Sequence, residues 1–422
     1  MTPQTAARAC GIDFGTSNST VGWLRPGQDT LLQLEDGKIT LPSVVFFNYE
    51  EDHSRFGREA LREYIDGYEG RLMRSLKSLL GSSLIDSQTE VQGKALPFRH
   101  LLTLFIKELK LRAEANAGRA FDEVVLGRPV YFVDDNPQAD KLAEDTLADI
   151  ARQVGFKEIS FQLEPIAAAF DYEASVQKEE LVLIVDIGGG TSDFTLIRLS
   201  PDRRAQAERR DDILATGGVH IGGTDFDRQL SLHGVMPLFG FKTRLRNNAE
   251  MPSSQYFNLA TWHTINFAYT RKAWMDLQDV HRDAAEPNKL DRLFRLIQER
   301  AGHWLAMEVE AAKIALSDQA QHRMALDPIE AGLSCELSRE DFEAGIAQML
   351  DRVATTVSKL LADAQLPAEA IDTVFFTGGS SGVPALRASI RALLPKAHHV
   401  EGNLFGSIGS GLAIEAMKRY GC

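Results

Sequence analysis

The chain has 422 residues, of which 44% are hydrophobic and 25% charged, as in an ordinary globular protein of roughly two to four domains. Its net charge of −13 argues against a nucleic-acid-binding groove, and no apolar run suggests a signal peptide or a membrane span. Three cysteines, Cys10, Cys335 and Cys422, show no paired spacing and no nearby histidine pattern, which argues against disulfide scaffolding and zinc. We therefore expect a cytoplasmic protein with no nucleic-acid or membrane partner.

The first predicted feature is a glycine-rich turn between two strands. Residues 11–20 read Gly-Ile-Asp-Phe-Gly-Thr-Ser-Asn-Ser-Thr and lead into the β-rich run 21–24. Glycine lets backbone N–H groups converge on an anion, and the hydroxyl groups add donors. Asp13 ends the first strand, where its carboxylate can hold a cation beside that anion.

Strands and helices then alternate up to about residue 174. The Asp36-Gly37 pair predicts a hairpin turn between strands at 31–34 and 43–47. Apolar spacing predicts helices over 58–64, 98–117 and 137–154, strands over 123–127 and 161–163, and a further helix after Glu164. In the helix 137–154, we expect Leu142, Leu147 and Ile150 to share one face.

A second glycine-rich turn repeats the pattern of the first. Residues 183–193 read Leu-Ile-Val-Asp-Ile-Gly-Gly-Gly-Thr-Ser-Asp and return into the strand 194–197. Asp186 stands where Asp13 stands in the first turn. One such turn is weak evidence, but two turns with matching carboxylate and hydroxyl positions predict that they bind a nucleotide's phosphates from both sides.

The remaining chain is predicted to complete a second α/β half. Residues 200–300 show the least regular pattern, and we interpret them as an insertion rather than a separate fold. The elements expected after it are a helix over 291–316, strands within 321–337, helices over 339–363, a strand over 373–376 and a closing helix over 410–419. The strand at 373–376 runs into Thr377-Gly378-Gly379-Ser380-Ser381.

In this order, the motifs resemble the ATPase domain of the DnaK-type heat-shock-70 chaperone family, and more closely its short YegD-like branch. The resemblance covers residues 10 to about 418 and is weakest between about 230 and 300. It is carried by the phosphate loops 11–20 and 186–193, by the segment 41–45 and the lysine-bearing segment 77–81, by the connecting segments 125–132 and 163–169, and by the segments 221–227, 310–317 and 376–380.

The resemblance implies an α/β, two-lobed actin-like ATPase fold built from duplicated ribonuclease-H-like lobes. We expect an N-terminal lobe over 9–183 and a C-terminal lobe over 184–418, with an insertion subdomain at about 228–312. Because the sequence stops at Cys422, we expect no peptide-clamp domain.

The resemblance also implies the roles of individual residues. Asp13 and Asp186 would surround Mg²⁺ through water, and Asp193 would complete the acid cluster and could hold K⁺. Lys77, Glu164, Asp186 and Thr191 would be catalytic, with Lys77 neutralising charge on the transferred phosphoryl group. The expected nucleotide contacts are Gly15, Thr16, Ser17, Asn18, Gly188, Gly189, Gly190, Gly222, Gly223, Glu310, Lys313, Ser317, Gly378, Gly379 and Ser380.

Each of these roles has a plainer alternative. Asp13 and Asp186 could fix their own turns, Lys77 could lie on a solvated face, and Glu164 could complement a helix dipole. The chain also departs from the family at the base: Gly382 replaces the usual stacking arginine, and its partner position is the apolar Ile314.

The function expected from the resemblance is an ATP-binding, slowly ATP-hydrolysing chaperone-like protein. Mg·ATP in an interlobe cleft would drive lobe closure, ATP and ADP would be its ligands, and its client or co-chaperone proteins stay open. Three alternatives remain: a small-molecule kinase, an actin-like filament protein and a non-hydrolysing nucleotide-gated interaction module.

Overall fold

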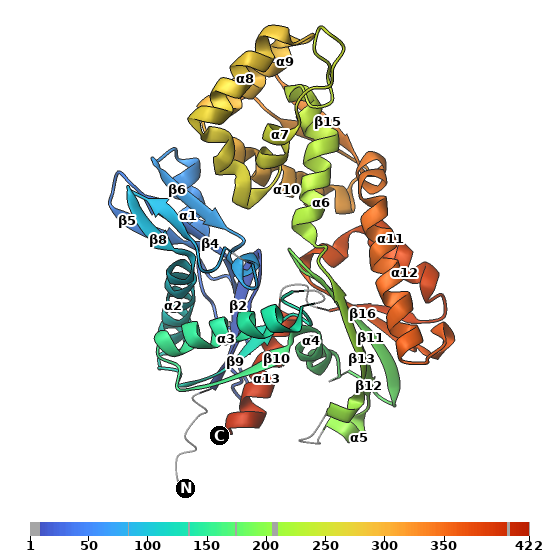
Figure 1. The fold of residues 1–422 in the computed structure, drawn as a ribbon. Coiled ribbons are helices and arrows are strands. Elements are labelled where there is room, and N and C mark those ends of the chain that lie inside the picture. Colours follow the sequence, from blue (N-terminus) through green and yellow to red (C-terminus); the bar gives the residue numbers. More distant parts are fainter. Residues whose placement is uncertain are drawn as a thin grey trace. The chain divides into compact units, whose positions relative to one another are not determined.

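The computed structural model describes residues 9–82, 84–133, 136–173, 175–204, 210–402 and 406–421. Cys422 therefore lies outside the described residues. By their internal contacts, these residues form two compact units. The first unit comprises the chain up to Gly222, Arg352–Ser381 and the chain from Leu386; the second comprises Gly223–Asp351 and Gly382–Ala385. Figure 1 shows the elements in the colours of the sequence.

Two five-stranded sheets form the frame of the first unit. The first has the order β10-β9-β1-β2-β3, and the second has the order β13-β12-β11-β16-β17. Their strands are β1 (Ala9–Phe14), β2 (Asn18–Gly22), β3 (Thr40–Pro42), β9 (Glu123–Arg128), β10 (Glu158–Leu163), β11 (Glu180–Ile187), β12 (Ser192–Leu199), β13 (Ile213–Val219), β16 (Thr373–Thr377) and β17 (His398–Glu401).

The two sheets share one connectivity. In each, a first strand forms an antiparallel hairpin with the next strand (β1 with β2, β11 with β12), which pairs antiparallel with a third. On its other side, the first strand pairs parallel with a later strand, which has a further parallel neighbour. Both glycine turns therefore occupy the same place in their sheets, at the tip of the first hairpin.

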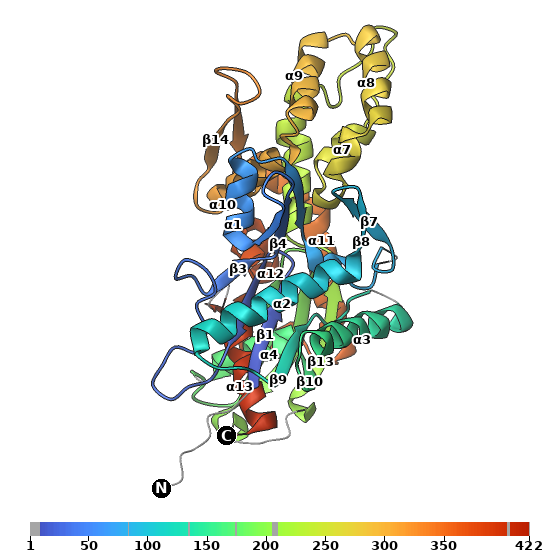
Figure 2. The same ribbon diagram turned by 90° about the vertical axis from the view of Figure 1, so that its left-hand side faces the viewer.

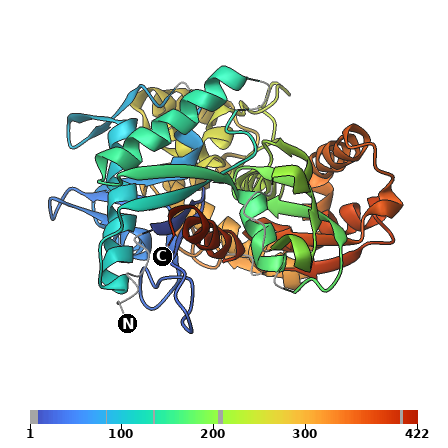
Figure 3. The same cartoon turned by 90° about the horizontal axis from the view of Figure 1, so that it is seen from below.

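Helices α4 (Glu164–Glu173) and α13 (Ser407–Tyr420) pack between the two sheets (Figure 3). Small side chains permit this close packing: a Cβ atom on Gly411 would collide with the carbonyl group of Ala167. A buried apolar cluster here joins residues of both sheets to both helices, including Val125, Ile184 and Leu412. Helices α4 and α13 therefore form a tightly packed layer that both sheets share.

Helices α2 (Phe98–Ala117) and α3 (Pro137–Gln153) cover the other face of the first sheet (Figure 2). Phe105 of α2 packs on Phe14 of β1, with ring centroids 5.7 Å apart. The other elements of the first unit are β4 (Val44–Asn48), β5 (His53–Phe56), β6 (Gly70–Arg74), β7 (Gln88–Val91), β8 (Lys94–Pro97), α1 (Gly57–Ile65), η1 (Leu76–Leu79), α5 (Pro201–Arg204), η2 (Arg210–Asp212), the part of α11 (Arg339–Asp363) from Arg352 on, η6 (Ala368–Ala370) and most of α12 (Pro384–Leu393).

The second unit is mainly helical. Its elements are α6 (Gly223–Leu230), η3 (Ser231–Val235), η4 (Met236–Phe239), α7 (Ser254–Leu259), η5 (Trp262–Tyr269), α8 (Arg271–Asp283), α9 (Pro287–Gln298), α10 (Gly302–Asp318), the hairpin β14 (Gln321–Ala325) and β15 (Ser334–Ser338), and the start of α11 (Arg339–Asp363). Residues 200–300, predicted to be irregular, thus contain several helices.

Three local predictions differ from the structure. The segment 31–34 forms only an isolated bridge, Gly22 to Leu31, instead of a strand. Leu142 is 54% exposed and does not share the buried face of Leu147 and Ile150. The helix predicted over 291–316 is two helices, α9 and α10, because the chain turns at Arg300, whose φ is 50°.

Across the described segments, no helix combines the length and the apolar character that a membrane crossing requires.

Candidate phosphate-binding site

The two glycine turns lie against each other in the first unit. The second turn is closed by a hydrogen bond from the Gly188 N–H to the Thr191 carbonyl, with a donor–acceptor distance of 2.9 Å. A Cβ atom on Gly189 would come within 2.6 Å of the Ser17 Oγ, and one on Gly190 within 3.3 Å of the Thr16 Oγ1. Residues 15–18 and 188–191, far apart in sequence, therefore form one polar surface.

Two further predicted glycines are packed beside the second turn. A Cβ atom on Gly222 would lie 2.6 Å from backbone atoms of Gly189 and Gly190. Gly378 has a φ of +79°, and a Cβ atom there would collide with Asp186. At both positions a side chain has no room, so glycine is required for the close approach of these segments. Gly379 and Ser380 follow Gly378 in the short helix η7 (Gly379–Gly382).

Three carboxylates gather at the base of these turns. Asp13 lies near the end of β1, Asp186 lies on β11, and Asp193 lies opposite Asp186 on β12. Burial and the negative charge of Glu164 raise the pKa of Asp13 to about 7, and the same two causes raise the pKa of Asp193 to about 7. Burial also raises the pKa of Asp186 well above its ordinary value, with Glu164 and Asp193 adding to the effect. Burial and mutual repulsion therefore disfavour full ionisation of these carboxyls unless a cation lies beside them.

Lys77 and Glu164 form a buried ion pair beside this cluster. Their side chains are 9% and 6% exposed. Burial alone would lower the pKa of Lys77, but the charges of Glu164 and Asp13 outweigh burial and raise that pKa. The alternative that Lys77 lies on a solvated face is thus excluded, and the ammonium group stays charged at neutral pH.

The cluster has the character of a cation site. The Oδ1 atom of Asp186 is buried without a hydrogen-bond partner, which is unusual for a carboxylate oxygen inside a protein. Asp193, in contrast, accepts a hydrogen bond of 2.8 Å from the Val130 N–H. Within the described ranges, no three carboxylate, histidine or cysteine side chains come close enough together to ligate a metal ion directly. This arrangement fits Mg²⁺ that keeps part of its water shell.

The remaining predicted nucleotide contacts belong to the second unit. Lys313 of α10 is buried, pairs with Asp227 at 2.8 Å and donates to the Gly223 carbonyl at 3.3 Å. Ser317 donates to the carbonyl of Lys313, one turn earlier in the helix, and Glu310 lies on the same helix. Ile314, between them, is 59% exposed.

Two groups that shape the site lie in the segments 41–45 and 125–132, to which sequence reasoning gave no role. One is the backbone N–H of Val130, which holds Asp193. The other is Ser43, fully buried, which binds the first glycine turn through a 2.7 Å hydrogen bond from its hydroxyl group to the Gly15 carbonyl. Both contacts join segments far apart in sequence, so the motifs could mark these residues but not the partners that they contact.

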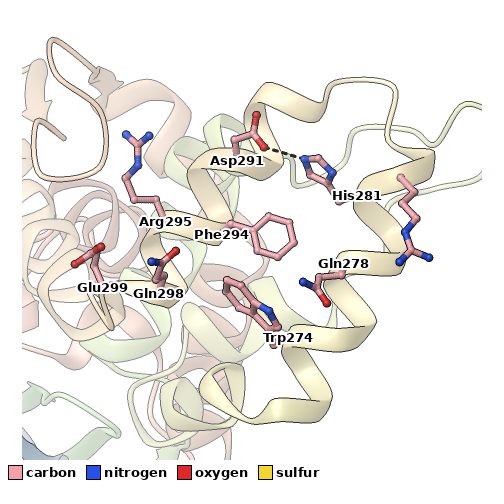
Figure 4. Close-up of a pocket in the computed structure, with 9 residues that line it drawn as sticks. Trp274, Gln278, His281, Asp291, Phe294, Arg295, Gln298 and Glu299 are labelled. Carbon is pink, nitrogen blue, oxygen red and sulfur yellow. Dashed lines mark hydrogen bonds and ion pairs between the residues drawn. The ribbon is translucent and has the colours of Figure 1, made fainter.

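A separate pocket of about 670 Å³ lies between α8 and α9 in the second unit (Figure 4). Trp274 and Phe294 meet edge to face in it, with ring centroids 4.8 Å apart, and His281 pairs with Asp291 at 2.8 Å. None of the predicted nucleotide-binding or catalytic residues lines this pocket.

Comparison with protein families matches the chain to the family described as Hsp70 protein, over residues 9–103, 88–248 and 287–418. These ranges contain every residue of the phosphate-binding site described above. The unmatched residues 249–286 include α7, η5 and α8, so one wall of the separate pocket lies outside the match. Since the match covers most of the sequence, the chain belongs to the Hsp70 family.

Proposed function

We propose that the chain binds Mg·ATP through the glycine turns of the first unit and hydrolyses it slowly. Hsp70 proteins are ATP-binding chaperones with ATPase activity, and the mixed α/β architecture fits an actin-like ATPase fold. The observation that carries the proposal is the contact between residues 15–18 and 188–191, beside the carboxylates of Asp13, Asp186 and Asp193 and the Lys77–Glu164 pair.

In this proposal, each group has a distinct task. The amides and hydroxyls of Thr16, Ser17 and Thr191 bind the terminal phosphates, for which glycine turns supply converging donors. Lys77 places a fixed positive charge near the γ-phosphate, where negative charge redistributes during hydrolysis, and with Glu164 it orients the attacking water.

Asp13, Asp186 and Asp193 would hold Mg²⁺, partly through water, and Asp193 could also hold K⁺. Mg²⁺ supplies charge neutralisation at the phosphate oxygens when it is bound. The unpartnered Asp186 oxygen and the raised pKa values of Asp13 and Asp193 support this role, since a nearby cation would return these carboxyls to their ionised forms.

The proposal extends to the cellular role. We propose a chaperone-like protein of the YegD-like branch, in which Mg·ATP draws together the lobes predicted at 9–183 and 184–418. The matching connectivity of the two five-stranded sheets supports duplicated lobes. Client or co-chaperone proteins would respond to the nucleotide state.

Calorimetry with ATP in the presence and absence of Mg²⁺ tests the proposal. Binding should require Mg²⁺ and should be strongly weakened in Asp186→Ala and in Asp13→Ala. Asp29→Ala, at an exposed loop carboxylate, is the matched control and should bind as the wild type does. Undiminished affinity in both site variants would refute the assignment.

A further inference from the structure

Ser43 contacts both ends of the first glycine turn. Its hydroxyl group donates to the Gly15 carbonyl at 2.7 Å, and its backbone N–H donates to the Ser17 carbonyl at 2.9 Å. Ser43 itself is fully buried, whereas residues 15–18 are partly exposed. The two carbonyl groups therefore point into the protein interior.

The direction of these carbonyls decides the direction of the neighbouring amides. A trans peptide is planar, so its C=O and the following N–H point in opposite directions. Because Ser43 holds the carbonyls of Gly15 and Ser17, the N–H groups of Thr16 and Asn18 must point away from the buried pocket around Ser43. Carbonyl oxygens would repel a phosphate, and amide N–H groups attract it.

A second serine, Ser19, completes the buried pocket. Its hydroxyl lies 3.0 Å from the Ser43 hydroxyl, and both side chains are fully buried. The single proton of the Ser43 hydroxyl is committed to the Gly15 carbonyl, so Ser19 donates and Ser43 accepts. Ser19 thus supports Ser43, and this bond does not reach the turn itself.

A buried serine makes the same kind of hydrogen bond at another predicted nucleotide-binding turn. The fully buried Ser381 donates its hydroxyl proton to the Gly378 carbonyl at 2.8 Å, and its N–H reaches the same oxygen at 3.1 Å. By the same peptide geometry, the Gly379 N–H points away from Ser381. Arg387 in turn holds the Ser381 carbonyl at 2.7 Å.

We propose that Ser43 is a positioning residue for phosphate binding: it withdraws the carbonyls of the first glycine turn and thereby aims the Thr16 and Asn18 amides at the nucleotide's phosphates. Ser381 acts in the same way on the Gly379 amide. This inference rests on the proposed function, since it assigns a role within the same site. Neither serine touches the nucleotide.

The test compares Ser43→Ala with Ser19→Ala. Each variant removes one buried hydroxyl from the same pocket, so a purely structural role predicts similar losses of stability and similar, small effects on binding. Ser43→Ala removes the hydroxyl that holds the Gly15 carbonyl but keeps the backbone N–H that holds the Ser17 carbonyl. A positioning role therefore predicts that only Ser43→Ala weakens Mg·ATP binding, by about tenfold, because the freed Thr16 amide loses a charge-assisted hydrogen bond. Ser43→Cys, which keeps a weak donor, should fall between wild type and Ser43→Ala.

The measurements are calorimetric affinities for Mg·ATP and for adenosine, with thermal unfolding of each variant. Adenosine lacks phosphates, so its affinity should be unchanged in Ser43→Ala, and the ratio of the two affinities reports the turn alone. If Ser43→Ala and Ser19→Ala bind Mg·ATP equally, the positioning role is refuted. If the wild-type protein itself does not bind Mg·ATP, the proposed function fails instead. If Ser43→Ala does not fold, Ser43→Cys must show the selective loss of Mg·ATP affinity for the inference to stand.

Discussion

Lys77 and Glu164 show how a residue that looks unremarkable in the sequence becomes central in the structure. The ammonium and carboxylate groups are both almost completely buried. A buried ion pair adds little net stability, yet removal of one partner is costly because the other charge is left uncompensated. The loss of Lys77 should therefore affect both the stability of the protein and its ATP turnover, and experiments can measure these two effects separately.

We expect Lys77→Ala to lose ATP turnover by on the order of 100-fold or more, with little change in nucleotide affinity, because a fixed charge acts mainly on the transition state. The same variant should lose roughly 3–5 kcal/mol of stability, since Glu164 stays buried without its partner. Turnover assays and urea unfolding measure the two effects.

The double variant Lys77→Ala/Glu164→Gln serves as the control. It removes both charges, so it should regain most of the stability but none of the turnover. Turnover within a few-fold of wild type in Lys77→Ala would show that the lysine has no catalytic part.

Gly382 offers a test of base recognition. Its φ is not positive, and a Cβ atom there meets no atom within 4 Å, so a side chain is tolerated. Gly382→Arg should favour ATP over GTP, by up to roughly 1 kcal/mol if the guanidinium stacks on the adenine. Competition binding with both nucleotides measures the ratio; Gly382→Ala is the control, and an unchanged ratio in Gly382→Arg contradicts the prediction.

The packing of helix α13 depends on small residues. On Gly411, a Cβ atom would overlap the carbonyl of Ala167 in α4, and on Gly409 it would collide with Thr20. Glycine occupies both helix positions although alanine favours a helix by about 1 kcal/mol more. Close packing between the helices and both sheets therefore outweighs helix propensity here.

Gly411→Ala should lower the free energy of unfolding by roughly 1–3 kcal/mol, because the helices must separate to admit the methyl group. Chemical denaturation measures the loss. Ser410→Ala, one residue away and partly exposed, should change stability by less than about 0.5 kcal/mol. A neutral or stabilising Gly411→Ala would show that the helix pair can move apart freely.

Elements with strong local signals could be predicted from the sequence. Helix α2 matches its predicted range, 98–117, because its apolar spacing is regular and Gly118 ends it with a φ of 66°. Both glycine turns were also predicted, since the strand, turn and strand lie next to one another in sequence. Within 200–300, helix was predicted only from residue 291 on, within α9. The other helices there were missed; several are short and polar, so tertiary packing decides their conformation.

The site could be predicted only in part for the same reason. Candidate residues follow from motifs, but the raised pKa of Asp193 depends on burial and on Glu164, which lies on another element. Likewise, Ser43 reaches Gly15 only after β3 has paired with β2. Such effects belong to the folded chain and leave no pattern in the sequence.

The whole molecule carries a net charge of −13, and two of its buried acids, Asp186 and Asp193, lie opposite each other on β11 and β12. The pKa of Asp193 is about 7 when folded, against an ordinary value of 3.8. Between these values the folded state binds a proton that the unfolded state has released, so stability falls as pH rises. The slope is about 1.4 kcal/mol per pH unit for each such group, and it levels off above pH 7.

We therefore expect the protein free of nucleotide and divalent cations to lose stability between pH 5 and about pH 7. Asp193→Asn keeps an acceptor for the Val130 N–H but cannot ionise. Its free energy of unfolding should therefore fall less steeply with pH, by the slope that one titrating group contributes. Urea unfolding at several pH values measures both slopes. Asp29→Asn is the control, and equal slopes in Asp193→Asn and wild type would contradict the raised pKa.

The position of α13 between the sheets also bears on how the chain is made. The ribosome releases β1 (Ala9–Phe14) long before α13 (Ser407–Tyr420), yet Gly11 of β1 packs directly on Leu412 and Ala413. The first sheet cannot bury this face until translation has passed Tyr420. Contacts this distant in sequence slow folding, so the nascent protein must keep apolar strands exposed during most of its synthesis. Although it belongs to a chaperone family, this protein should itself need protection from aggregation during its synthesis.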